Sequence, residues 1–511
     1  MGVIDQLFLE EKEIQGLLDD LQAGQGQQLI TGLSGGSKAV FFKVIQQSLE
    51  RPVLIVSPNM LQAQRTYDDL VKMIGDEHVH LYTAEELVAA DFSFASYELR
   101  AGRIETLDHM ARIGSGIYIT PVAGLRKLLP TKKRWLNHYV TAQTDEEIDI
   151  EAWLEKLVSM GYIRNDLVSA PGEFALRGGI LDIYPLTTQD PVRIELFDTT
   201  IDSIRTFSAE DQRSTGKLEK ITLLPATEFI WTPEELLQVS RKVEQALGDS
   251  LTKIKSEDLQ QQLLTTIMED VGLMKDGIVP DTMKKYVSFS SEANSMLTDY
   301  FPSNGLIVFD ELGRIQESVA TLEAEEQEFQ LAMLEDGKML HDTKLSWKYD
   351  YVLGKIQQLR LYLSLFTRVV PGFTIKKSIA ISCKPMQQFH GQMPLLKNEI
   401  ERWKQGNYNV FLLAASTERM NAIQGILQEY DIEAAVNGQP TKEGTLSIIE
   451  GDLSVGFELP FQKLAVITDA EMFTGKPKRK ARPPKITNAE RIKSYSEIKP
   501  GDYIVHVHHG S

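Results

Sequence analysis

The stretch QQLITGLSGGSKAVFFKVIQQSLERPVLIVSPN, residues 27–59, decides the fold class. It predicts a strand, a glycine-rich turn, a helix and a second strand, because short apolar runs flank a longer segment. The run VLIVS at 53–57 is apolar throughout, as is typical of a parallel strand buried on both faces. Similar runs follow at 79–82 and 116–130, with a helix expected around 100–113. This alternation predicts α/β layers around a parallel sheet.

The composition and the spacing of the predicted elements change further along the chain. Residues 161–225 are rich in β-branched residues, and ILDIY, PVRIELFD and IDSIRTFS predict closely spaced strands, with a helix near 153–160 behind them. Beyond this small α+β module, the pattern favours helices at 233–283 and mainly helices over 315–370. The apolar runs SIAISC, NVFLLAAS, LSIIEG and KLAVITD then indicate a third α/β unit that begins near Lys377.

Composition excludes several classes of protein. The 511 residues include 54 basic and 72 acidic side chains, for a net charge of −18, so nucleic acid or an anionic membrane could be bound only by a local patch. No apolar stretch approaches the length of a membrane span, and the acidic N-terminus is unlike a signal peptide. The single cysteine, Cys383, leaves no internal disulfide framework or multi-cysteine zinc site. These features favour a cytoplasmic protein.

The turn GLSGGSKA at 32–39 resembles a phosphate-binding loop, G-x-x-x-x-G-K-[ST], and departs from it. Gly32 and Lys38 match the motif, whose backbone amides surround phosphates while its lysine neutralises their charge. Ser37 stands where the second glycine belongs, and Ala39 replaces the hydroxyl residue that binds Mg²⁺. This pattern predicts a nucleotide-type fold that has lost its chemistry.

An acidic pair, Asp310-Glu311, follows the apolar run LIVF and has the form that normally completes such a nucleotide site. A live ATPase is the alternative interpretation, and weak anion binding at the helix N-terminus is a second one. The first alternative is disfavoured because no later helicase-type arginine motif is found. We therefore expect no catalytic residue in this chain.

A candidate protein-binding face lies in the small α+β module. If 191–198 is a strand, Val192 and Ile194 share one face, whereas Arg193 and Phe197 share the other. The segment GEFALRGG alternates likewise and places Arg177 on its polar side. Arginine beside an exposed aromatic ring is typical of binding hot spots. The alternative is a solvated face with one isolated exposed aromatic residue.

Three further stretches carry a family resemblance. They are GEFALRGGILDIYPLTTQDPVRIELFDTTIDSIRTFSAEDQRS at 172–214, GDLSVGFELPFQKLAVITDAEMF at 451–473 and KPGDYIVHVHHG at 499–510. Together they resemble the N-terminal part of the bacterial transcription-repair coupling factors, the Mfd family. The resemblance covers essentially the whole chain.

The resemblance implies an α/β multidomain fold, similar at its start to the damage-recognition protein UvrB. A degenerate P-loop NTPase-like domain is split by an inserted α+β domain, and a small α/β domain and the start of a truncated, CarD-like β domain follow. The implied boundaries are 1–138 and 226–350 for the split domain, 139–225 for the insert, 365–475 for the third domain, 476–489 for a basic linker and 490–511 for the truncated domain.

The same resemblance implies the partners. The inserted domain is implied to bind UvrA through Arg177, Arg193 and Phe197, and residues 490–511 would begin a domain that binds RNA polymerase. DNA, ATP and Mg would be bound mainly by motor domains that lie beyond this chain, so no cofactor is expected here. The implied function is recruitment of UvrA in nucleotide excision repair at stalled RNA polymerase.

Two other functions are alternatives to this one. A UvrB-like repair helicase is disfavoured by the altered phosphate loop and by a stretch at 83–100 that is too poor in tyrosine to clamp DNA. A purely autoinhibitory structural region would share the fold and need no UvrA contact. The cluster His506, His508 and His509 is interpreted as ordinary strand residues and not as a metal site.

Overall fold

The structure is a computed structural model that describes residues 2–85, 97–366, 372–436 and 446–473. The predicted linker at 476–489, the predicted domain start at 490–511 and its three histidines lie outside the described residues, as do residues 86–96 of the tyrosine-poor stretch. Residues Met1–Thr474 form one structural unit.

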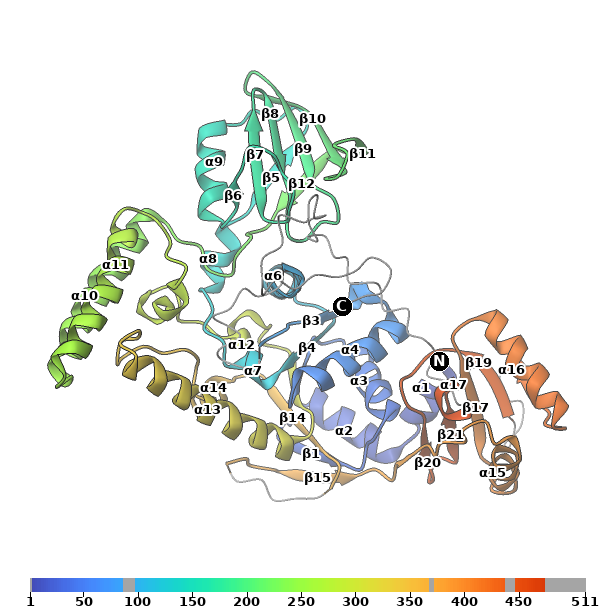
Figure 1. The fold of residues 1–511 in the computed structure, drawn as a ribbon. Helices are drawn as coiled ribbons and strands as arrows, with labels where there is room; N and C mark the ends of the chain where they lie inside the picture. Colours follow the sequence, from blue (N-terminus) through green and yellow to red (C-terminus); the bar gives the residue numbers. More distant parts are fainter. Residues whose placement is uncertain (1, 86–96, 367–371, 437–445, 474–511) are drawn as a thin grey trace, which may run out of the picture. The chain divides into compact units, whose positions relative to one another are not determined.

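A seven-stranded parallel sheet is the centre of the fold (Figure 1). Its strands lie in the order β15-β1-β14-β13-β2-β4-β3, and every neighbouring pair is parallel. The predicted strand at 53–57 is β2 and is fully buried, as expected. The bounds are β1 (Gln28–Thr31), β2 (Val53–Ser57), β3 (Val79–Leu81), β4 (Ile117–Pro121), β13 (Leu306–Phe309), β14 (Leu359–Ser364) and β15 (Lys377–Ala380).

Helices cover both faces of this sheet because its strands are apolar on both sides. Ile30 and Ile55 face a core shared with the first four helices, whereas Leu29 and Leu54 face a second core shared with the other set. The first set is α1 (Gly2–Leu9), α2 (Lys12–Gln22), α3 (Gly36–Leu49) and α4 (Met60–Ile74). The second is α6 (Tyr97–Arg112), α7 (Val122–Leu125), α12 (Leu297–Tyr300), α13 (Leu312–Glu335) and α14 (Tyr349–Lys355).

The predicted α+β module is confirmed as a six-stranded sheet with a helix behind it. The strand order is β11-β10-β9-β8-β7-β6, and Leu157 of the helix packs in the core that includes Phe174 and Leu181. The bounds are α9 (Ile150–Ser159), β6 (Ile163–Arg164), β7 (Glu173–Arg177), β8 (Ile180–Ile183), β9 (Val192–Phe197), β10 (Thr200–Phe207) and β11 (Ser214–Leu218). A two-stranded sheet of β5 (Val140–Gln143) and β12 (Lys220–Leu223) begins and ends the module.

Two long helices follow the module, as the sequence predicted. Thr232 caps the first of them, its side chain accepting from the Glu235 amide while Glu235 accepts from the Thr232 amide. This reciprocal arrangement and Pro233 in the first turn fix where the helix begins. The helices are α10 (Pro233–Lys253) and α11 (Glu257–Lys275), and α8 (Lys132–Asn137) precedes the module.

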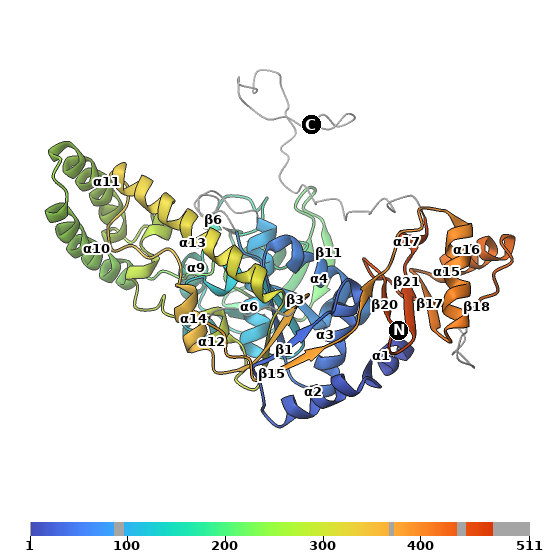
Figure 2. The same cartoon turned by 90° about the horizontal axis from the view of Figure 1, so that it is seen from below.

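The sheet of the third α/β unit, called the third sheet below, is mixed in direction and follows the order β16-β20-β21-β17-β19-β18. Figure 2 shows its helices α15 and α16 beside the sheet. Its described strands are β16 (Lys384–Pro385), β17 (Asn409–Ala414), β18 (Ala435–Val436), β19 (Leu446–Glu450), β20 (Phe457–Leu459) and β21 (Leu464–Ile467). Its helices are α15 (Met393–Gln405), α16 (Thr417–Glu429) and α17 (Asp469–Met472).

Two expectations about the middle of the chain need revision. Residues 359–364 were expected within a mainly helical stretch, but they form β14 and pair with both β1 and β13. The run at 377–380, expected to begin the third α/β unit, is β15 and pairs with β1 of the first sheet. The sequence pattern failed at both places because a short apolar run shows neither whether it is a helix or a strand nor which sheet it joins.

Candidate protein-binding face

The outer face of the six-stranded sheet carries all three residues that the sequence singled out. Arg177 is the last residue of β7, Arg193 lies in β9, and Phe197 ends β9. Val192 and Ile194 are fully buried in the core below the sheet. Alternation along β9 therefore points Arg193 and Phe197 away from that core, as predicted.

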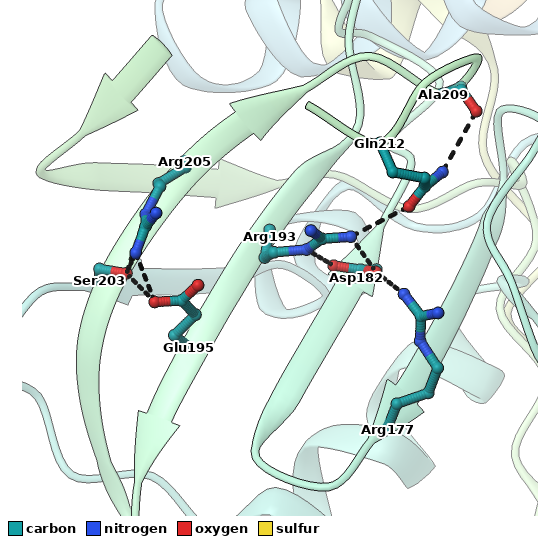
Figure 3. Close-up of polar contacts among 8 residues, drawn as sticks. All are labelled: Arg177, Asp182, Arg193, Glu195, Ser203, Arg205, Ala209 and Gln212. Carbon is teal, nitrogen blue, oxygen red and sulfur yellow. Dashed lines mark hydrogen bonds and ion pairs between the residues drawn. The ribbon is translucent and has the colours of Figure 1, made fainter. Parts of the chain in front are cut away.

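One buried carboxylate holds the two arginines together (Figure 3). Asp182 in β8 accepts a hydrogen bond from Nη2 of Arg177 at 2.8 Å. It also accepts two from Arg193, at 2.7 Å from Nε and 2.9 Å from Nη2. The Asp182 side chain is 1 % exposed, whereas that of Arg177 is 48 % exposed. Two positive charges thus share one negative charge, and a net positive charge remains at the surface.

Arg193 is fixed by further contacts. Its Nη2 donates to Gln212 Oε1 at 3.0 Å, and Gln212 in turn donates to the carbonyl of Ala209 at 3.2 Å. The guanidinium lies over the Phe207 ring, 4.4 Å from its centroid. Hydrogen bonding to Asp182 raises the pKa of Arg193 above its ordinary value. The side chain is therefore held in one orientation before any partner arrives.

A second ion pair lies beside the first on the same face. Arg205 in β10 is paired in register with Arg193, and its Nη2 lies 2.5 Å from Glu195 Oε2. Ser203 donates to the same carboxylate at 2.9 Å (Figure 3). The Arg205 side chain is 40 % exposed. The two ion-paired groups together contain three arginines and two carboxylates.

Phe197 is 79 % exposed, although a phenylalanine side chain stabilises a fold chiefly when it is buried. An exposed aromatic residue next to a rigid charged cluster is the composition of a protein-binding hot spot.

Sequence reasoning missed Asp182 and Arg205. The register of the sheet places Asp182 directly opposite Arg193, and Arg205 opposite Arg193 on the other side. The alternation in ILDIY would have put Asp182 on the same face, but only the strand pairing shows which arginines it reaches.

The altered phosphate loop is a second place where predicted residues meet. Lys38 Nζ lies 2.8 Å from Asp310 Oδ1 and 2.5 Å from Glu311 Oε1. Burial alone would lower the pKa of Lys38, but attraction to the two carboxylates outweighs it and the pKa is raised. Burial raises the pKa of Asp310, against the opposing effect of Lys38. The lysine that would neutralise a phosphate is therefore already neutralised by the protein.

Gly32 begins the loop with φ of 94°, a left-handed conformation suited to glycine. The Ser37 hydroxyl donates to the Ser34 carbonyl at 2.7 Å and accepts from the Ser34 amide at 3.1 Å. Ala39 packs in the core. The two departures from the motif thus serve local structure.

In the described part of the chain, no cluster of three or more histidine, cysteine, aspartate or glutamate residues could hold a metal ion. Over the same ranges, no helix combines the length and apolarity needed to cross a membrane.

Comparison with known proteins agrees with the resemblance found in the sequence. Residues 140–229 match the family model of the UvrB interaction domain. The whole chain is 41 % identical to a transcription-repair-coupling factor of Bacillus subtilis. It is 35 % and 36 % identical to those of Staphylococcus haemolyticus and Staphylococcus epidermidis, over 99 % and 100 % of its length. The chain spans only 43 to 44 % of the length of these relatives.

Proposed function

On the premise that this chain belongs with the transcription-repair-coupling factors, which it matches over its whole length, we propose that it recruits UvrA through the outer face of the six-stranded sheet. The contacting residues would be Arg177, Arg193 and Phe197. Recruitment would deliver UvrA to stalled RNA polymerase for nucleotide excision repair.

The observation that carries the proposal is the rigid arginine cluster beside an exposed phenylalanine. Asp182 and Gln212 hold Arg193 in place, so little conformational entropy is lost when a partner binds. A partner that fits this face would offer carboxylates to the net positive charge and an apolar pocket to Phe197.

We further propose that this chain is not itself an enzyme and binds no cofactor. The pairing of Lys38 with Asp310 and Glu311 supports this proposal, because a phosphate would have to displace two carboxylates. In the whole protein, ATP and Mg would serve a DNA translocase in other domains. RNA polymerase would be bound by the domain that begins at 490–511.

The domain division remains part of the proposal. We propose a split UvrB-like domain at 1–138 and 226–350, an inserted UvrA-binding domain at 139–225 and a third domain at about 365–475. The pairing of β14 and β15 with β1 supports extending the second part of the split domain to Ala380 and beginning the third domain after that residue.

Calorimetric titration of UvrA into the chain tests the recruitment. We expect binding that weakens by about 2 kcal/mol or more on either Arg193→Ala or Phe197→Ala. Phe461→Ala is the matched control, because Phe461 is 81 % exposed and lies in the turn between β20 and β21, outside the sheet of β6 to β11.

The outcomes of this titration distinguish the assigned face from the alternatives. Unchanged affinity in both variants would refute the assigned face, while loss in Phe461→Ala as well would indicate nonspecific apolar contact. Absence of any binding by the intact chain would favour a purely structural, autoinhibitory role.

A further inference from the structure

The glycine-rich turn at 32–36 is in contact with backbone carbonyl groups from distant parts of the chain. The amide of Gly36 donates to the carbonyl of Val455 at 3.0 Å. This amide opens α3, at the place where a phosphate would be bound in a working loop. Val455 lies in the segment 451–456 that leads into β20 of the third sheet.

The glycines are needed for this contact. A Cβ added to Gly36 would lie 2.4 Å from the carbonyl oxygen of Val455 and 2.9 Å from the Leu453 side chain. At Gly35, it would lie 3.2 Å from the carbonyl oxygen of Gly456, and at Gly32 only 2.0 Å from that of Ile381. Three glycines of the turn therefore each admit a carbonyl group of the same chain.

We infer that this turn is the docking site for residues 451–456 and that its bound ligand is the protein's own backbone. Further anchors flank the contact. Asp69 in α4 accepts from the Ser454 amide and hydroxyl, both at 2.8 Å. Lys72 of the same helix lies 2.6 Å from Asp452.

Apolar packing continues the same interface. Leu453 and Phe457 belong to the core that also contains Val40 and Phe41 of α3. Asp69 is itself buried, and its pKa is raised by that burial, against the opposing effect of the hydrogen bonds from Ser454. The hydrogen bonds from Ser454 satisfy this buried carboxylate. Polar as well as apolar contacts therefore hold residues 451–456 in place.

Docking excludes nucleotide independently of the two altered motif positions, Ser37 and Ala39. The Gly36 amide is already bonded, carbonyl oxygens face the turn, and Lys38 is paired with two carboxylates. Restoring the consensus at Ser37 and Ala39 would change none of these contacts. The turn thus fixes the third sheet against the first, a role that stands whether or not the chain binds UvrA.

Hydrogen exchange in Gly36→Ala tests the docking. Alanine normally favours a helix, so this change should be harmless unless residues 451–456 sit on the glycine. We expect the amides of 453–456 to exchange about tenfold faster or more, because the segment is pushed off its site. Gly16→Ala in α2 is the matched control, since no atom lies within 4 Å of the added Cβ.

Ser454→Ala provides a milder second variant, in case Gly36→Ala lowers the stability of the whole protein. It removes one hydrogen bond to Asp69 and should raise exchange in the same segment to a smaller extent. Exchange at 453–456 that matches the Gly16→Ala control in both variants would overturn the inference.

A nucleotide titration gives an independent readout. In the double variant Ser37→Gly/Ala39→Ser, we expect no binding of a fluorescent ATP analogue with Mg²⁺ at the level seen for working loops. Saturable binding by this variant, with 453–456 still protected from exchange, would show that the segment does not occupy the nucleotide site and would refute the inference.

Discussion

Asp182 and Arg193 form a two-point ion pair in which the carboxylate is buried and the guanidinium reaches the surface. Nε and Nη2 of Arg193 lie 2.7 and 2.9 Å from the two oxygens of Asp182. The Asp182 side chain is 1 % exposed, and that of Arg193 17 %. Asp182, which a partner could not contact, thereby fixes the orientation of Arg193, which a partner could contact.

Asp182→Asn should weaken UvrA binding by about 2 kcal/mol, because an amide offers one acceptor oxygen and no charge to two arginines. The sheet should remain folded but become less stable. Calorimetry would give the affinity, and urea unfolding the stability. Asp202→Asn is the control, since Asp202 is exposed on β10.

A double-mutant cycle separates positioning from simple destabilisation. The cycle combines Asp182→Asn with Arg177→Ala. If Asp182 acts through Arg177, the double variant should lose at least about 0.5 kcal/mol less binding free energy than the sum of the two single variants. Strict additivity would show that Asp182 contributes only to the stability of the sheet.

Arg205→Ala should reduce UvrA affinity by about 1 kcal/mol, less than the change at Arg193. The loss should be smaller because Arg205 is more exposed than Arg193. Some affinity should still be lost, because without Arg205 the Glu195 carboxylate would offset the positive charge of the neighbouring Arg193. The loss should shrink as salt is raised, since exposed charges are screened. Titrations at two salt concentrations, with Arg213→Ala as an exposed control, would check this. Equal affinity for Arg205→Ala and the intact chain would place Arg205 outside the contact.

Lys38→Met should destabilise the fold by about 3 kcal/mol, because Asp310 would be left buried without its cationic partner. Adding Asp310→Asn and Glu311→Gln should restore much of that stability, since no uncompensated charge then remains. Urea unfolding of the three proteins measures both effects. Lys338→Met, which breaks an exposed pair with Asp336, should change stability little. A single Lys38→Met variant as stable as the intact chain would contradict the structural role of the ion pair.

His80 should make the fold less stable in mild acid. Burial, with smaller contributions from His109 and His78, lowers its pKa from the ordinary 6.5 to about 4. The His80 and His109 rings lie 3.6 Å apart between centroids, so a charged imidazolium is disfavoured there. Between pH 6.5 and 4 the unfolded chain binds a proton that the folded chain does not, so stability falls as the pH falls through this range.

Thermal unfolding at pH 7 and pH 5 measures the effect of His80. His80→Phe should lose about 1 kcal/mol less stability than the intact chain over this interval. His341→Gln, at an exposed histidine, should behave as the intact chain does. Identical pH dependence in all three proteins would rule out His80 as the source of acid sensitivity.

Local patterns in the sequence predicted much of the fold. The apolar run at 53–57 and the alternation at 192–197 each depend on side chains only a few residues apart, and both expectations are confirmed. The strand at 359–364 was missed because its burial arises from β1 and β13, which are remote in sequence. Periodicity cannot show such a partner.

The sequence by itself determined the residue types: the arginines and phenylalanine of the candidate face, and the glycines and lysine of the altered loop. Only the tertiary structure decided what they touch. Sheet register brought Asp182 under Arg177 and Arg193, and chain folding seated Val455 on Gly36. The physical reason is that hydrogen bonds and ion pairs act over a few ångströms in space, whatever the separation along the chain.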